Sequence, residues 1–437
     1  MIHIQIAYNS SYPVPPYDKE SLIEIYHHVL KMDGGQTAQY IPQLANADPN
    51  QFAIALCDLE GNVYSVGDSD RGFSIQSACK PILYGLALKH HGADHVHSKV
   101  GNEPSGKPFD DLSIDQYGKA YNPMVNAGAI ITASMLPGAI ARDQYDVFED
   151  TVRRMALKDS KQVRMDSSVY DSEMNTNARN SEITEDLVNR NLVVGDPIGS
   201  LAAYTMACSC SVNTLDAAVI AATLANRGTN PTTKEACMTE IIADQIVTVM
   251  MSCGMYNGAG KWIVDVGVPA KSGVSGGIMG VVPGVCGFAV FSPRLDEHGN
   301  SVRGVHVAQA LSKSLGGLGL HVLKQGLKAM PTEKVGDKTR KPRRGSSGGE
   351  DKSPSAHKAR KPGNSSTSPS TNEQVWESGR SGVTRLAHRS RGVGMTIGWK
   401  YFFRARCQLW TSWTTQRTIN SHRTSAQYCL TDYVGTE

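Results

Sequence analysis

The fold of this 437-residue chain is indicated by the segment FSIQSACKPI, residues 73–82. Ser77 and Lys80 are spaced i, i+3, so on a helix that begins at Ser77 they lie one turn apart on the same face. A serine hydroxyl needs a neighbouring base to act as a nucleophile, and a lysine desolvated in a cleft has a lowered pKa that suits this role. The segment therefore predicts a serine nucleophile with a lysine base near the N–H groups of a helix terminus. A serine N-cap followed by a surface lysine is the alternative interpretation.

A second element, VPAKSGVSGG, covers residues 268–277 and contains Lys271-Ser272-Gly273. We expect a strand here that lines the site, because a glycine-rich strand edge lets a substrate approach the backbone closely. The N–H of Val274 is a candidate for the second oxyanion donor. A turn rich in Gly and Ser is the alternative. Ser-x-x-Lys followed by Lys-Ser-Gly is typical of penicillin-binding proteins and serine β-lactamases, which predicts a catalytic role for Lys271.

Hydrophobic periodicity places helices and strands around these two elements. The predicted helices cover residues 19–32, 77–92 with Gly92 as C-cap, 212–227 as the clearest amphipathic helix, 239–253 and about 307–326. The predicted strands form a hairpin over 52–68 and cover 262–268, 284–293 and 302–308. This order predicts an α+β fold: a mixed antiparallel sheet built from both chain ends, flanked by N- and C-terminal helices, with the helical middle inserted as a second lobe.

Charge divides the chain into two parts. From residue 331 onward there are 19 Lys and Arg against 8 Asp and Glu, whereas the preceding residues carry 25 and 33. Residues 336–373 are rich in Lys, Arg, Ser, Pro and Gly and almost free of large apolar side chains, so we expect disorder. We therefore divide the chain into an N-terminal extension (1–18), a globular domain (19–328) and a basic, low-complexity tail (329–437). No nucleic-acid-binding pattern accompanies the basic tail, so no nucleic-acid partner is predicted.

The nine cysteines are odd in number, lie mostly in apolar runs and lack the spacing of a zinc ribbon or finger, which favours reduced thiols in an intracellular protein. Histidines 90, 91, 95 and 97 have no acidic or cysteine partner at ligand spacing, so neither a metal nor a cofactor is predicted. No apolar stretch reaches the roughly 18–20 residues of a membrane span. The first 20 residues lack the pattern of a signal or transit peptide. A cytoplasmic protein without membrane contact is the prediction, with a mitochondrial location left open.

The most distinctive segments are NPMVNAGAI (122–130) and PAKSGVSGG (269–277). Six further segments extend the set over about residues 20–325: GQTAQYIPQLA (35–45), SIQSACK (74–80), VGNEPSGKPFD (100–110), SEMNTNARN (172–180), SCGMY (252–256) and GNSVRG (299–304). With this set, which β-lactamases and penicillin-binding proteins do not carry, the chain resembles the glutaminase family of single-domain serine enzymes. The resemblance implies a β-lactamase/transpeptidase-like fold and hydrolysis of L-glutamine to L-glutamate and ammonia. It also implies a homo-oligomer, as a dimer or a homotetramer.

The resemblance further implies a role for each matching residue. Ser77 is the nucleophile, Lys80 its base, Tyr256 assists proton transfer and Tyr40 closes over the site. The implied substrate-binding residues are Gln76, Ser77, Asn126, Glu173, Asn180, Tyr204, Tyr256 and the backbone at Val274. A carboxylate suits the α-ammonium group of glutamine, and Glu173 is the candidate, whereas neutral donors suit its carboxylate and amide.

Plainer interpretations of these residues stay open. Asn126 has the position of a helix N-cap, Glu173 that of a solvated helix carboxylate and Tyr204 that of a core residue. For the whole protein, the alternatives are a related serine hydrolase acting on another amide or a β-lactam, and a non-catalytic scaffold whose basic tail is the working part.

Overall fold

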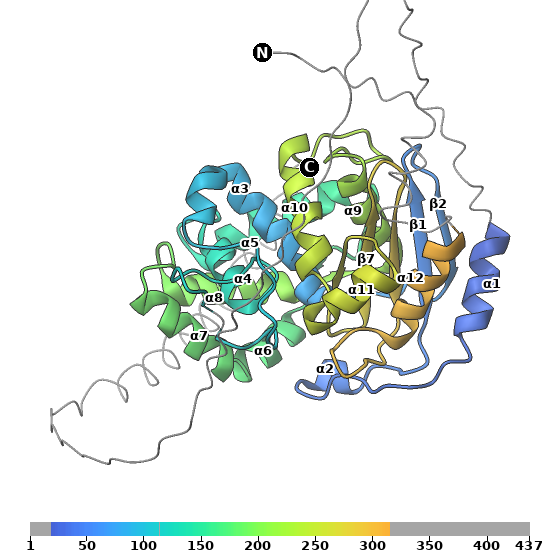
Figure 1. The fold of residues 1–437 in the computed structure, drawn as a ribbon, viewed down its shortest axis with the longest axis horizontal. Coiled ribbons are helices and arrows are strands. Elements are labelled where there is room, and N and C mark those ends of the chain that lie inside the picture. Colours follow the sequence, from blue (N-terminus) through green and yellow to red (C-terminus); the bar gives the residue numbers. More distant parts are fainter. Residues whose placement is uncertain (1–18, 113, 315–437) are drawn as a thin grey trace, which may run out of the picture. The chain divides into compact units, whose positions relative to one another are not determined.

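Five antiparallel strands drawn from the two ends of the body form the main sheet (Figure 1). They are β1 (Ala53–Asp58), β2 (Val63–Gly67), β6 (Ala270–Ser272), β7 (Gly277–Val282) and β8 (Cys286–Phe291), in the order β2-β1-β8-β7-β6. Strands β1 and β8 pair in register from Ala53 opposite Phe291 to Asp58 opposite Cys286. The α+β fold with an antiparallel sheet built from both chain ends is thereby confirmed. A small second sheet joins β3 (Phe73–Ser74), β5 (Cys210–Val212) and β4 (Arg164–Met165).

The computed structural model describes residues 19–112 and 114–314. The predicted extension (1–18), the predicted tail (329–437) and the end of the last predicted helix lie outside the described residues, so the domain boundaries stay predictions. In the part that is described, no helix combines the length and apolar character needed to span a bilayer.

Helices cover both faces of the sheet and form a separate lobe beside it (Figure 1). The helices are α1 (Lys19–Val29), α2 (Pro42–Ala45), α3 (Lys80–His97), α4 (Asn126–Ser134), α5 (Ala141–Met155), α6 (Ser167–Asn175), α7 (Ala178–Asn189), α8 (Pro197–Cys208), α9 (Thr214–Ala225), α10 (Glu240–Cys253), α11 (Ala259–Asp265) and α12 (Val302–Ser314). Helices α1 and α12 pack together against the sheet, and α9 packs against β1, β7 and β8. Helices α4 to α8 pack on one another, which confirms the predicted helical lobe.

Helix α9 corrects one detail of the sequence analysis. The helix predicted over 212–227 forms, but it is not amphipathic, because every residue of α9 except Leu215 is buried. It lies between the sheet on one side and helices α5 and α10 on the other, so it has no solvent face. A helix that is apolar all round is the expected form for such a position.

Two strands predicted from β-rich composition are helical. Residues 262–265 lie in α11, and Ala259, Trp262 and Val266, which directly follows the helix, are buried at helical spacing. Residues 302–308 lie in α12, where the buried residues Val307, Ala308 and Leu311 also follow a helical period. In both segments burial follows the 3.6-residue period and overrides the β-propensity of valine and isoleucine. Strand β7, which follows the Lys-Ser-Gly element, was missed because its sequence GIMGVV contains two glycines.

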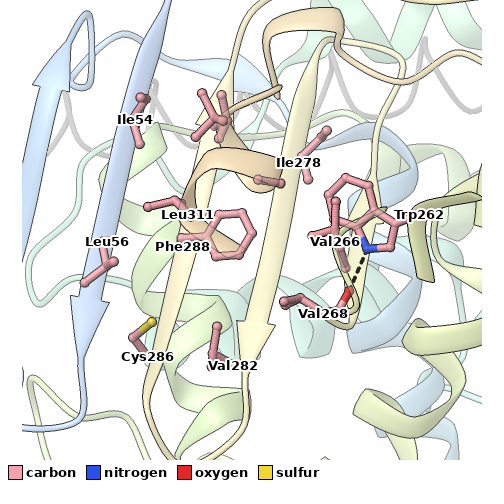
Figure 2. Close-up of a cluster of buried hydrophobic side chains, with 14 of the residues drawn as sticks. Ile54, Leu56, Trp262, Val266, Val268, Ile278, Val282, Cys286, Phe288 and Leu311 are labelled. Carbon is pink, nitrogen blue, oxygen red and sulfur yellow. Dashed lines mark hydrogen bonds between the residues drawn. The ribbon is translucent and has the colours of Figure 1, made fainter. Parts of the chain in front are cut away.

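A hydrophobic cluster joins the sheet to the helices on the α1 and α12 face (Figure 2). Phe288 of β8 is 1% exposed, pairs with Leu56 of β1 and lies close to Leu311 of α12. The indole Nε1 of Trp262 donates to the carbonyl of Val268 at 2.6 Å, which satisfies the polar atom of this buried ring. These contacts attach the segment that precedes β6 to the core.

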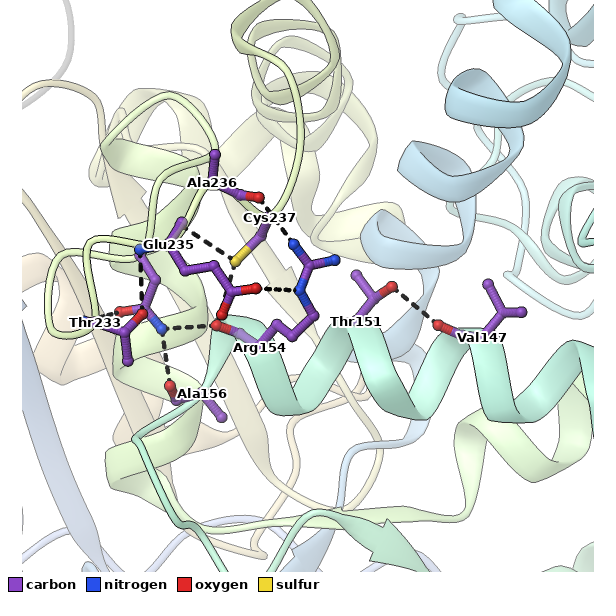
Figure 3. Close-up of polar contacts among 9 residues, drawn as sticks. Val147, Thr151, Arg154, Ala156, Thr233, Glu235, Ala236 and Cys237 are labelled. Carbon is purple, nitrogen blue, oxygen red and sulfur yellow. Dashed lines mark hydrogen bonds and ion pairs between the residues drawn. The ribbon is translucent and has the colours of Figure 1, made fainter.

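Polar contacts hold the loop 230–237 to the end of helix α5 (Figure 3). Arg154 forms an ion pair of 2.5 Å with Glu235 and donates to the carbonyl of Ala236 at 2.9 Å. The thiol of Cys237 donates in turn to the carbonyl of Arg154 at 3.2 Å. The loop between α9 and α10 is thus attached to the helical lobe.

We expect Gly287→Ala to destabilise the protein by about 1–3 kcal/mol or more, because overpacking at a rigid contact forces backbone shifts. A Cβ atom at Gly287 would lie 2.0 Å from the backbone nitrogen of Ala222 in α9. Urea unfolding measures the change. The matched control is Gly260→Ala in α11, where a Cβ meets nothing within 4 Å and alanine favours the helix by about 1 kcal/mol. Equal stabilities of the two variants would contradict this account of the packing between α9 and the sheet.

Candidate active site

The residue predicted as nucleophile lies at the junction of the sheet and the helical lobe. Ser77 is 6% exposed and belongs to a 3₁₀ turn, η1 (Gln76–Cys79), which continues directly into α3. The α-helix therefore begins at Lys80 and not at Ser77. Side chains at i and i+3 eclipse in a 3₁₀ helix, so a turn of this kind still directs Lys80 and Ser77 to the same side. Gly92, predicted as C-cap, interrupts α3 with a φ of 75°, and the helix resumes beyond it.

The backbone at the start of this turn is strained. Gln76 has a φ of 50°, a conformation that residues other than glycine rarely adopt. Tyr256, in a second 3₁₀ turn, η2 (Tyr256–Gly258), has a φ of 53°. Left-handed conformations of such residues cluster at functional sites, where the surrounding structure imposes them. Gln76 and Tyr256 are both among the site residues predicted from the sequence.

Lys80 is fully buried beside Ser77. Its Nζ donates to Oδ1 of Asn126 at 2.7 Å and lies 5.9 Å from the ring centroids of Phe109 and Tyr204. Burial lowers the pKa of Lys80 to about 8, with the nearby thiols of Cys79 and Cys208 acting in the opposite direction. A substantial fraction of its amine is therefore neutral at slightly alkaline pH, as a general base requires.

A second buried lysine reaches the site from strand β6. The Nζ of Lys271 donates to the carbonyl of Ser272 at 2.7 Å and lies 4.2 Å from the ring centroid of Tyr256. Burial lowers the pKa of Lys271 well below its ordinary value, and the neighbouring charge of Lys80 lowers it further. Because two interacting ammonium groups repel each other, the pair favours the state in which at least one of the two amines is neutral.

Tyr256 shares the carbonyl of Ser272 with Lys271. Its hydroxyl donates to that oxygen at 2.9 Å. Burial raises the pKa of Tyr256, and a hydrogen bond with Ser77 acts in the opposite direction. The ring packs against Phe109, with 4.9 Å between centroids. Tyr256 is therefore a protonated phenol in contact with Ser77, able to pass a proton.

Asn126 is the centre of a polar network from the helical lobe. It is the first residue of α4, whereas the N-cap is Val125, so the N-cap interpretation of Asn126 is wrong. Its Oδ1 accepts from Lys80 and, at 3.2 Å, from the hydroxyl of Tyr204, and its Nδ2 donates to Oδ1 of Asn180 at 2.9 Å. Tyr204 is 3% exposed, so it is both a core residue and a neighbour of the lysine.

Glu173 of helix α6 forms a second polar cluster of the site, with Tyr40 and Gln76. Its Oε1 accepts from the hydroxyl of Tyr40 at 2.7 Å and from Nε2 of Gln76 at 3.0 Å. Burial raises the pKa of Glu173, and these two hydrogen bonds partly offset that rise. The side chain is half-buried and partnered, so it is not a freely solvated helix carboxylate.

Val274 lies just beyond β6, next to η1. Gly273 permits this approach, because a Cβ atom there would lie 2.8 Å from the carbonyl oxygen of Ile75. A pocket of about 580 Å³ adjoins the site at Val274, Tyr256 and Phe109. Phe109 and the Ser272 carbonyl are site groups that the sequence does not predict. Phe109 lies within the distinctive segment 100–110, but nothing local to it signals contact with Tyr256.

Of the four histidines considered as metal ligands, His91 and His97 have other hydrogen-bonding partners, and the rings of His91 and His95 stack with 5.1 Å between centroids. The Nε2 of His97 lies 3.0 Å from the hydroxyl of Tyr84, and the Nε2 of His91 lies 2.8 Å from the carbonyl oxygen of Met135. Across residues 19–112 and 114–314, no group of three or more His, Cys, Asp or Glu side chains is arranged to hold a metal ion.

Comparison with known proteins gives one consistent result. The pattern of the Glutaminase family matches residues 35–320. A glutaminase of Trichormus variabilis is 47% identical over 294 residues, covering 67% of this chain and 87% of that protein. The solved structure of the probable glutaminase ybaS superposes with a TM-score of 0.66 at 37% identity, covering 69% of this chain and 97% of that one. A probable glutaminase from Bacillus subtilis, complexed with 6-diazo-5-oxo-L-norleucine, superposes with a TM-score of 0.61 at 31% identity, covering 69% and 95%.

We expect Lys80→Met to be more stable than the wild type near pH 7. The folded-state pKa of Lys80, about 8, lies below the ordinary value of 10.5. The folded protein therefore binds fewer protons between these values, and its free energy of unfolding rises with pH across that window. The penalty, at most roughly 3 kcal/mol, is fully present below pH 8 and is relieved as the pH approaches 10.5.

Urea unfolding at about pH 7 and about pH 9.5 tests this. The stability advantage of Lys80→Met over the wild type should shrink at the higher pH. Lys89→Met, at an exposed position of α3, is the matched control and should show no such change. An advantage that is absent, or that stays constant with pH, would contradict the assignment.

Proposed function

The chain belongs to the glutaminase family, and from this premise we propose how its residues divide the work of hydrolysing L-glutamine to L-glutamate and ammonia. The observation that carries the proposal is the contact network around Ser77: Tyr256 hydrogen bonds with Ser77, buried Lys80 follows it by one turn, and the buried Nζ of Lys271 lies 4.2 Å from the Tyr256 ring. Three groups that can hold or move a proton beside one serine hydroxyl suit acyl transfer through a serine ester.

In the acylation step, the neutral amine of Lys80 takes the proton of Ser77 while Oγ attacks the side-chain carboxamide carbon. The C–O bond forms and the carbonyl π electrons move onto oxygen. The backbone N–H groups of Ser77 and Val274 are the proposed donors to this oxyanion. When the intermediate collapses, the C–N bond breaks and the nitrogen leaves as ammonia with a proton delivered through Tyr256.

In the deacylation step, water attacks the ester carbon and transfers a proton to the same base. The ester bond to Ser77 breaks and Oγ recovers a proton, so L-glutamate leaves and the starting state returns. Lys271 acts through Tyr256: its ammonium or amine group holds the Ser272 carbonyl to which the phenol donates. We assign it the role of setting the protonation and orientation of Tyr256.

We assign the substrate-binding roles by matching each charged or polar group of L-glutamine with a complementary side chain. Glu173 pairs with the α-ammonium group, and Tyr40 and Gln76, which donate to Glu173, orient it. Asn126, Asn180 and Tyr204 form a neutral polar wall suited to the α-carboxylate and the carboxamide. A site that pairs each polar group of its substrate discriminates strongly against analogues that lack one.

Two features expected from the sequence stay predictions. One is the homo-oligomeric state, as a dimer or tetramer, and the other is the cytoplasmic location. Size-exclusion chromatography with light scattering and subcellular fractionation address them directly.

We expect Ser77→Ala to lower L-glutamine turnover by at least about 10³-fold, because the acyl-enzyme cannot form without Oγ. Release of ammonia and L-glutamate from the full chain measures it, with L-asparagine tested in parallel. The matched control is Ser98→Ala, an exposed serine at the far end of α3, which should leave turnover unchanged. Wild-type turnover by the Ser77 variant would refute the assigned nucleophile.

We expect Glu173→Gln to raise the KM for L-glutamine roughly 10- to 100-fold, the effect of losing a hydrogen bond to a charged group. Glutaramate, which lacks the α-amino group, supplies the decisive comparison. Its already poor turnover should change little in the variant if Glu173 pairs with the ammonium group. Glu182→Gln, an exposed residue of α7, is the control. An equal loss with both substrates would show that Glu173 does something other than bind the ammonium group.

A further inference from the structure

Two cysteine thiols meet directly beneath the candidate active site. Cys79 belongs to η1 and Cys208 is the last residue of α8, and their sulfur atoms lie 3.8 Å apart. Both residues are buried, Cys79 at 0% exposure and Cys208 at 7%. Thiols elsewhere in the described part, such as those of Cys210 and Cys237 (Figure 3), donate to backbone carbonyls instead.

The pair is embedded among the residues that carry the chemistry. Cys79 stands between Ser77 and Lys80 in the same turn. Cys208 lies one helical turn beyond Tyr204. A negative charge on the Cys208 sulfur would raise the pKa values of Lys80, Tyr204 and Tyr40. The more exposed thiol of the pair therefore lies within electrostatic range of three of the proposed site residues.

We propose that Cys79 and Cys208 form a redox-active pair, which hydrogen peroxide oxidises to a disulfide that reversibly inactivates the enzyme. The inactivation rests on the proposed function, whereas formation of the disulfide does not. A Sγ–Sγ bond is about 2.05 Å long, so the two sulfurs must come about 1.8 Å closer.

The chemistry balances with the peroxide as the only co-reactant. The sulfur of Cys208, as the more exposed thiol, attacks one peroxide oxygen: the S–O bond forms, the O–O bond breaks, and the displaced hydroxide takes the thiol proton to become water. The sulfur of Cys79 then attacks that of Cys208. The S–S bond forms, the S–O bond breaks, and hydroxide leaves with the Cys79 proton as a second water. Two thiols lose two electrons and two protons, and the peroxide is reduced to two molecules of water.

Formation of the disulfide would move the turn η1, which carries Ser77. Drawing Cys79 toward α8 shifts η1, and with it the Ser77 hydroxyl and the 2.7 Å contact between Lys80 and Asn126. A displacement of about 1 Å in a reacting group lowers turnover about 10²-fold. Burial raises the pKa of Cys79, which keeps this thiol protonated and slow to react until its neighbour has been oxidised.

The experiment treats the full-length protein with hydrogen peroxide and follows L-glutamine turnover together with non-reducing peptide mapping. We expect a loss of turnover of about 10²-fold that parallels the appearance of a peptide pair linked through Cys79 and Cys208. Dithiothreitol should restore the activity.

The Cys79→Ala variant should keep its basal turnover and lose its sensitivity to peroxide, whereas the matched control Cys237→Ala should stay as sensitive as the wild type. Mapping the wild type decides the question even if Cys79→Ala does not fold. Inactivation without the Cys79–Cys208 link, or the link without inactivation, would overturn the proposal. Absence of glutamine turnover in the reduced wild type would instead refute the proposed function, while the mapping would still report on the pair.

Discussion

The close approach of strand β6 to the turn that carries Ser77 is the constraint on which the site depends. The turn and the strand end touch at Gly273, where any side chain would collide with the carbonyl of Ile75. Because the two backbones meet there, the Ser272 carbonyl lies within reach of both Lys271 and Tyr256. The glycine of the Lys-Ser-Gly element is thus as necessary to the arrangement as the lysine, since it sets the distance between the two halves of the site.

The close approach of the turn and the strand buries two lysines, and this burial lowers their pKa values. Lys80 and Lys271 are both fully buried, and desolvation of an ammonium group favours its neutral form. The same desolvation that makes a neutral amine available opposes folding, because the unfolded chain solvates both ammonium groups. The hydrophobic cluster around Phe288 (Figure 2) and the buried helix α9 supply apolar burial that offsets this penalty.

The site also depends on the helical lobe, which is inserted in the chain between strands β2 and β6. The lobe contributes Asn126, Glu173, Asn180 and Tyr204 from four different helices, whereas the sheet side contributes Tyr256 and Lys271. Ser77, the proposed nucleophile, lies on the segment between the two. In the proposed mechanism the lobe binds the substrate groups and the sheet side moves protons, and the thiols of Cys79 and Cys208 meet at the same junction.

The sequence by itself determined the α+β fold class, the family, and the positions of Ser77 and Lys80, because these depend on local spacing and on short distinctive motifs. Tertiary structure decided the rest. It made helices of residues 262–265 and 302–308 and buried α9 on nearly every side. It also placed the Asn126 side chain against Lys80 instead of at a helix cap. It alone brought Tyr40 to Glu173 and Cys79 to Cys208. Each of these outcomes depends on which distant surfaces the sheet and the lobe bury together, and burial of that kind leaves no periodic signal in a short window of sequence.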